Sequence, residues 1–97
     1  MPTYVSLLKW TEQGIRNAKE TVERGEQARR AAEQMGGRLP TILWTQGAYD
    51  VVLVAEFPDD ETATAYLLGL GRLGNVRSET LRAFTAEEMR RILQKVP

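Results

Sequence analysis

The 97 residues carry 13 basic and 13 acidic side chains, so no net charge attracts nucleic acid or an anionic membrane. Hydrophobic residues make up 42% of the chain and charged residues 27%, which is typical of one globular domain. The sequence contains neither Cys nor His. This composition excludes disulfides, thiolate metal sites, the usual zinc and haem ligands and a Ser-His-Asp triad.

The N-terminus begins directly with a strand-like run, without a basic segment or a cleavage site, so we expect no signal peptide. No apolar run approaches the roughly 18 residues that a membrane span requires. We therefore expect a cytoplasmic protein.

Residues 3–10 are expected to form the first strand, which carries bulky side chains on both faces. One face holds Val5 and Leu7, and the even-numbered residues share the other: Tyr4, Ser6, Leu8 and Trp10. A short turn over 12–17 and a helix over 19–35 follow, and Gly36-Gly37 ends this helix. We expect a buried helical stripe of small and apolar residues, namely Val22, Ala28, Ala32 and Met35, with Gly25 between the first two.

The stretch from Leu43 to Phe57 predicts a β-hairpin. An apolar run enters a polar turn around Gly47, and a longer run of β-branched residues leaves it. Pro40 cannot donate to a ladder, which places the incoming strand, over 38–45, at the edge of the sheet or starts its pairing late. The outgoing strand is apolar on both faces, as expected for a central strand.

The C-terminal third predicts a helix, a strand and a second helix. The acidic segment 58–62 starts the first of these helices, whose apolar spacing continues to Leu73 before Gly74-Asn75 stops it. A last strand is expected over 76–84, and a capping box at Thr85 opens an appended helix over 85–97. The apolar side of this appended helix consists of Met89, Ile92, Leu93 and Val96, through which we expect it to pack.

This order predicts one α+β domain over 1–97 with a ferredoxin-like βαββαβ fold, in which both long helices cover one face of a four-stranded antiparallel sheet. Right-handed crossovers place the first and third strands in the centre. We expect the uncovered face to carry Leu8, Trp10 and parts of the hairpin strands. Because so much apolar surface needs a partner, we expect a homodimer or an assembly of dimers.

Three segments resemble the GYD domain family of small bacterial and archaeal proteins: Tyr4–Asn17, Trp44–Val52 and Gly74–Phe84. The resemblance implies a ferredoxin-like fold of the dimeric α/β-barrel kind and brings no established activity with it. The Gly47–Asp50 element also resembles the hairpin of the amino-acid-sensing domains in Lrp/AsnC regulators. Their DNA-binding helix-turn-helix is not found in this chain.

In this topology the end of the first strand, the hairpin and the start of the last strand share one end of the sheet. An indole, a phenol, a carboxylate and an arginine there could orient a small ligand. The candidate ligand-binding residues are Trp10, Trp44, Tyr49, Asp50, Asn75 and Arg77. Structural roles are at least as well supported, because Asp50 could cap backbone N–H groups or pair with Arg77, and Tyr49 could close the hairpin.

Other motifs carry less weight. Residues 69–74 have the glycine spacing of a dinucleotide fingerprint, but they lie late in a helix with no strand before them. The acids over 59–61 fit a helix start better than a cation site. The arginine pairs at 29–30 and 90–91 lack interleaved aromatic residues, so we expect no nucleic-acid surface.

Three functions remain open. The favoured one is a non-catalytic homo-oligomer that serves in assembly or binds a small carboxylate, an amino acid or an aromatic molecule. The second is a cofactor-independent isomerase or monooxygenase, with Tyr49, Asp50 and Arg77 as acid–base and oxyanion candidates. The third is a subunit that modifies a larger partner through the terminal helix. We expect no cofactor, no metal ion and no membrane partner.

Overall fold

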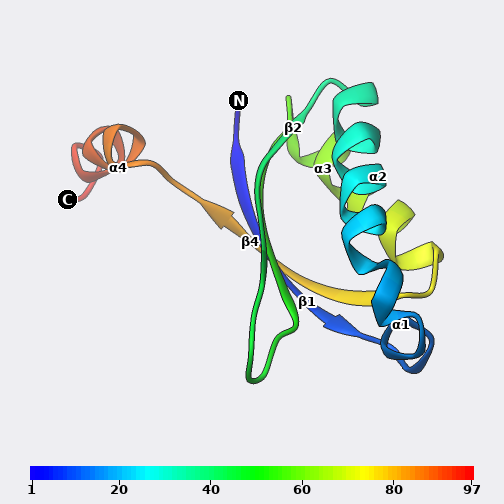
Figure 1. Ribbon diagram of the computed structural model, residues 1–97. Coiled ribbons are helices and arrows are strands. Elements are labelled where there is room, and N and C mark those ends of the chain that lie inside the picture. The colour runs from blue at the N-terminus through cyan, green and yellow to red at the C-terminus, as the bar shows by residue number, and fades with distance from the viewer.

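A four-stranded antiparallel sheet with the strand order β2-β3-β1-β4 forms the centre of the structure (Figure 1). The computed structural model describes residues 1–97. Its strands are β1 (Thr3–Trp10), β2 (Arg38–Trp44), β3 (Val51–Glu56) and β4 (Val76–Ala83). Its helices are α1 (Glu12–Arg16), the 3₁₀ turn η1 (Ala18–Glu20), α2 (Thr21–Gln34), α3 (Asp60–Arg72) and α4 (Ala86–Leu93). The predicted ferredoxin-like fold is confirmed.

The predicted strand positions are also confirmed. β1 and β3 are the two central strands and pair with each other from Thr3↔Glu56 to Leu8↔Val51. β2 lies at the edge, and its pairing with β3 is interrupted between Arg38 and Thr41, on either side of Pro40. Because proline has no N–H to donate, this irregularity stands where the sequence predicts it.

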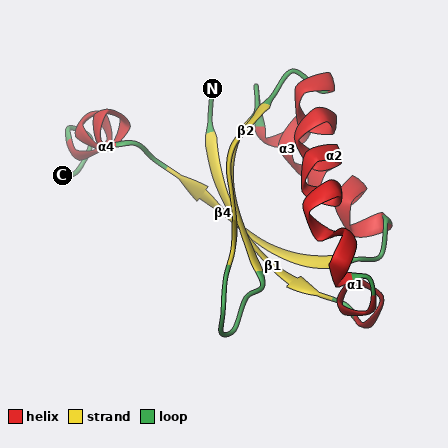
Figure 2. Cartoon of the chain, viewed as in Figure 1, coloured by secondary structure: helices red, strands yellow, loops and turns green.

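Helices α2 and α3 cover one face of the sheet and leave the other face open (Figure 2). The covered face carries the core, in which Phe57 stacks near Tyr66 with a ring separation of 4.8 Å. Leu8 belongs to this core and Trp10 packs against it, so the expectation that both lie on the open face is wrong. The even-numbered residues of β1 face the helices. The open face is lined instead by Val5, Leu7, Leu43, Val52, Val54 and Leu81, which occupy matching register positions.

Side-chain caps begin three of the helices at the predicted places. The Thr11 side chain accepts a hydrogen bond from the N–H of Gly14, and Asp59 accepts one from the N–H of Thr62. Thr85 and Glu88 form the capping box of α4. These residues satisfy backbone donors that would otherwise lack partners in the first turn.

The buried stripe of α2 differs from the predicted one. Ala32 is fully buried and Ala28 is half-buried, but Val22 is 59% exposed and Met35 is 37% exposed. Gly25, expected on this stripe between Val22 and Ala28, does face the sheet, and a Cβ atom added there would lie 3.6 Å from the Trp44 ring. A Cβ atom at that distance would be in ordinary van der Waals contact with the ring, so this approach does not require glycine.

Helix α4 stands apart from the rest of the molecule at the end of β4, on the side away from α2 and α3 (Figure 1). It contributes no buried residue, and Leu93 and Val96 are each about 60% exposed. The radius of gyration is 14.4 Å, whereas a compact domain of this length has about 12.5 Å. The expectation that α4 packs through its apolar side is therefore wrong within one chain. None of the helices has both the length and the apolar character that crossing a bilayer requires.

Candidate functional site

The end of β1, the hairpin loop and the start of β4 meet at one end of the sheet, as the topology predicts. Lys9 pairs with Arg77, Trp10 pairs with Val76, and the hairpin loop begins after Trp44. The sheet separates the predicted site residues, however, because alternate side chains point to opposite faces. The rim therefore consists of two different environments.

Tyr49 lies with the residues of the open face. Its hydroxyl donates a hydrogen bond to Glu79 at 3.1 Å, and the Lys9 ammonium lies 5.4 Å from the centre of its ring. The hydrogen bond to Glu79 raises the pKa of Tyr49 above its ordinary value. Arg77 shares this face, because it pairs with Lys9 in the register, and it makes no ion pair. The predicted Asp50–Arg77 pair is not formed.

Asp50 joins the hairpin to the end of β1. Its carboxylate accepts a hydrogen bond from the backbone N–H of Trp10 at 2.8 Å, and its own N–H donates to the carbonyl of Leu8 at 2.8 Å. Its carbonyl accepts from the N–H of Thr45 at 2.9 Å. Asp50 therefore extends the pairing of β1 and β3 by one residue. This is the backbone-capping role that the sequence suggested as one alternative for Asp50.

Trp10, Trp44 and Asn75 lie on the covered side, where they line a cavity of about 400 Å³ between the sheet, α2 and the C-terminal end of α3. Strand residues Leu8, Ile42, Val51 and Leu53 form its floor, and Gly25, Ala28 and Ala31 of α2 contribute the opposite wall. The Trp44 indole N–H donates to the Thr21 hydroxyl at 2.9 Å, which fixes this ring at the edge of the cavity. The remaining three predicted residues, Tyr49, Asp50 and Arg77, are not part of the lining.

Arg24 also lines the cavity and was not predicted from the sequence. Arg24 as a whole is half-buried, and its guanidinium donates to the carbonyls of Asn17, at 2.6 Å, and Gly14, at 3.4 Å. No carboxylate lies within ion-pair distance of it. One signal was present, since Arg24 lies one turn before Ala28 on the same side of α2, but charged residues of α2 are mostly solvent-exposed.

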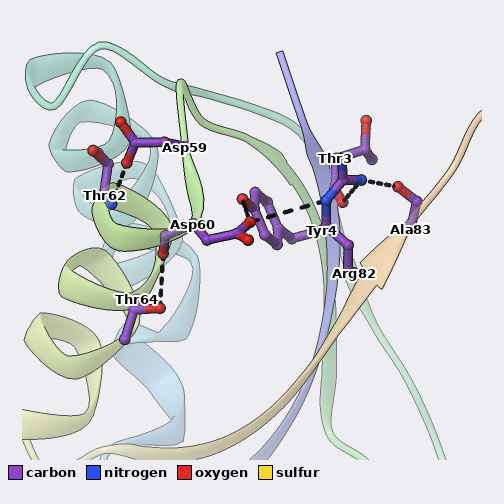
Figure 3. A network of polar contacts seen from close by, with 8 residues as sticks. All are labelled: Thr3, Tyr4, Asp59, Asp60, Thr62, Thr64, Arg82 and Ala83. Atoms are coloured by element: carbon purple, nitrogen blue, oxygen red, sulfur yellow. Dashed lines mark hydrogen bonds and ion pairs between the residues drawn. The ribbon is translucent and has the colours of Figure 1, made fainter.

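A second polar network lies at the opposite end of the sheet and was also missed (Figure 3). The Tyr4 hydroxyl donates to the carboxylate of Asp60, and the Nε atom of Arg82 lies 4.0 Å from the same oxygen. Burial and this hydrogen bond raise the pKa of Tyr4 to about 12. The network joins β1, α3 and β4, and its donors and acceptors satisfy one another. We therefore interpret it as architecture.

The acids that begin α3 have separate structural tasks. Asp59 caps the helix through the N–H of Thr62 at 2.7 Å, and this hydrogen bond lowers the pKa of Asp59. Asp60 accepts from Tyr4. No group of three or more acidic side chains is arranged to hold a metal ion.

The family model of the GYD domain matches residues 4–93, which is nearly the whole chain. The chain belongs to the GYD domain family. No curated protein and no solved structure matches it. In this GYD-domain protein the Gly-x-Tyr-Asp element, residues 47–50, forms the hairpin loop. Gly47 adopts a φ of 99°, which favours glycine, and Asp50 bonds to β1. Membership explains the fold and the hairpin, and the cavity is the feature that points to a function.

Proposed function

We propose that this GYD-domain protein is a homodimeric, non-catalytic binding module that takes up a small organic molecule in the cavity between its sheet and α2. The observation that carries the proposal is the cavity of about 400 Å³, whose lining is mostly apolar and includes both tryptophans of the chain. Protein interiors leave few voids larger than a water molecule, whereas ligand sites measure roughly 300–1,000 Å³. This space opens to solvent, and its volume lies within the range of ligand clefts.

The chemistry of the lining favours binding over catalysis. Arg24 is its one charged side chain, and the lining contains no carboxylate, lysine or tyrosine. General acid–base catalysis needs a group that exchanges protons near neutral pH, and arginine stays protonated. The candidates for an isomerase or monooxygenase, Tyr49, Asp50 and Arg77, lie outside the lining.

A second copy of the chain is the partner that we propose for the open face of the sheet. This face presents Leu43 and Leu81, which are 56% and 51% exposed, beside the half-buried Val52 and Val54. Helix α4 projects on the same side and carries its own exposed apolar row. Face-to-face association would cover the open face of the sheet and the apolar row of α4 at once, because a twofold axis brings the α4 helix of each copy against the other copy. We also propose that the protein acts in the cytoplasm.

Intrinsic fluorescence tests the binding proposal, because both tryptophans line the cavity. We expect at least one compound from a panel of small carboxylates, aromatic acids and amino acids to change the emission and raise the melting temperature. Ala31→Phe, which places a ring in the cavity, should fold normally and lose both responses. Val22→Phe, on the exposed side of the same helix, should keep them. Equal responses from the two variants, or none from the wild type, would refute binding in this cavity.

A further inference from the structure

The polar groups of the cavity gather at the end next to α1. Arg24 reaches this end, because its guanidinium bonds to the carbonyl of Gly14 in α1. Gly14 packs directly on the backbone of Asn75, where an added Cβ atom would collide with the carbonyl oxygen. Trp10 ends β1 opposite Val76, the neighbour of Asn75. Arg24, Asn75 and Trp10 therefore surround one end of an otherwise apolar space.

These three residues bring N–H donors that reach solvent and that no acceptor of the protein receives. The Arg24 guanidinium has five N–H groups, of which two bond to backbone carbonyls, and no carboxylate neutralises its charge. The Asn75 amide oxygen accepts from Gln13 at 2.9 Å, while its NH₂ group has no partner. The Trp10 indole N–H makes no hydrogen bond, unlike that of Trp44, which bonds to Thr21.

From this arrangement we infer that the ligand is an apolar monocarboxylate whose carboxylate pairs with Arg24 and whose apolar body lies against the Trp10 and Trp44 indoles. This inference rests on the proposed function. A guanidinium matches a carboxylate in a bidentate geometry, and a half-buried, apolar setting strengthens the pair. Asn75 can supply a further N–H donor. At roughly 30 Å³ for each water-sized atom, about 400 Å³ holds about a dozen non-hydrogen atoms.

The same lining disfavours amino acids. An α-ammonium group would enter the cavity beside Arg24, and no carboxylate on the lining could receive it. The buried ammonium would lose its hydration and gain a repulsive neighbour. Neutral analogues would keep their apolar contacts but lose the pair with the guanidinium. The structure therefore predicts the order acid, then alcohol, then amino acid or amine.

Titration of four phenyl compounds that differ in their polar group tests this order: 3-phenylpropionate, 3-phenylpropanol, phenylalanine and phenethylamine. Binding is measured by tryptophan fluorescence and calorimetry. We expect the acid to bind about 10- to 100-fold more tightly than the alcohol, because the alcohol lacks the charge-assisted hydrogen bond to Arg24. Arg24→Gln should abolish this preference while the alcohol binds as before. Arg30→Gln removes the same charge from the exposed side of α2 and should leave the preference intact.

The outcomes separate the two proposals. If the alcohol binds as tightly as the acid, or the amino acid binds more tightly, the carboxylate inference is wrong and the binding cavity stands. If Arg24→Gln keeps the preference for the acid, Arg24 is not the anchor and the inference also fails. If neither octanoate, benzoate nor any of the four phenyl compounds changes the fluorescence or gives a calorimetric signal, both proposals are wrong. Thermal unfolding of Arg24→Gln and Arg24→Lys checks that the variants fold, and Arg24→Lys should retain part of the preference.

Discussion

The carboxylate of Asp50 accepts a hydrogen bond from the backbone N–H of Trp10 at 2.8 Å, and this contact closes the end of the central strand pair. The bond joins the hairpin loop to β1, whose last residue, Trp10, lines the cavity. Asp50 thus lies outside the cavity lining and yet helps to hold one of its walls. This relationship ties the Gly-x-Tyr-Asp element to the shape of the candidate site.

We predict that Asp50→Ala lowers the free energy of unfolding by about 1.5–3 kcal/mol, the typical worth of a hydrogen bond to a charged group. Asp50→Asn should cost less, because the amide oxygen can still accept from Trp10. Chemical denaturation of both variants measures the difference. Equal stability of wild type and Asp50→Ala would show that the contact contributes nothing, whereas an equal loss in both variants would show that the charge matters and not the acceptor.

Two glycines in helices should respond to alanine in opposite directions. A Cβ atom on Gly14 would collide with the carbonyl of Asn75, while one on Gly69 meets no atom within 4 Å. Gly14→Ala should therefore destabilise the fold by about 1–3 kcal/mol through overpacking against backbone. Gly69→Ala should stabilise it by about 0.5–1 kcal/mol through helix propensity. Melting temperatures that move in the same direction would contradict the packing of α1 on the loop before β4.

Alkaline pH should destabilise the protein through Tyr4 and Tyr66. Burial raises the pKa of Tyr66 to about 12, and burial together with Asp60 does the same for Tyr4. Because the folded pKa lies above the ordinary value of 10.0, the stabilisation is complete below pH 10 and is lost as the pH rises toward 12. The loss is on the order of 2 kcal/mol for each tyrosine.

Tyr66→Phe isolates one of these contributions. It removes the hydrogen bond to the carbonyl of Ala28, 2.7 Å long, and should cost about 1 kcal/mol at pH 8. Between pH 10 and 12 the variant should lose stability less steeply than the wild type, because it has one fewer buried hydroxyl to ionise. Urea unfolding at a series of pH values compares the two slopes. Parallel curves would show that Tyr66 does not titrate as its burial implies.

Removal of α4 should weaken assembly without harming the core. The helix contributes no buried residue. A chain that ends at Phe84 should therefore have the same melting temperature as the full-length chain in its monomeric form. Sedimentation at micromolar concentration should show more monomer than for the full chain, because the apolar row of α4 no longer covers the second copy. Leu93→Ser should act in the same direction, while Gln94→Ser should not. A full chain that sediments only as a monomer would refute the homodimer.

The local pattern of residues was sufficient for the secondary structure. Alternating and helical apolar spacing, the caps at Thr11 and Thr85, and Gly36 and Gly47 at positive φ act over a few residues, so they can be identified in the sequence. Pro40 likewise placed β2 at the edge, because the missing N–H is a property of one residue. With right-handed crossovers, these elements permit few arrangements, and the strand order followed.

The tertiary structure alone decided which surfaces meet. Both faces of β1 carry bulky residues, so its pattern could not show that Leu8 and Trp10 turn toward the helices. The rotation of α2 about its axis, which places Gly25 beside Trp44 and leaves Val22 59% exposed, depends on contacts between separate elements. The same rotation brings Arg24 into the cavity, while the pleat sends Tyr49 and Arg77 to the other side. Spacing along the chain specifies elements, but a site depends on distances between elements, which only packing determines.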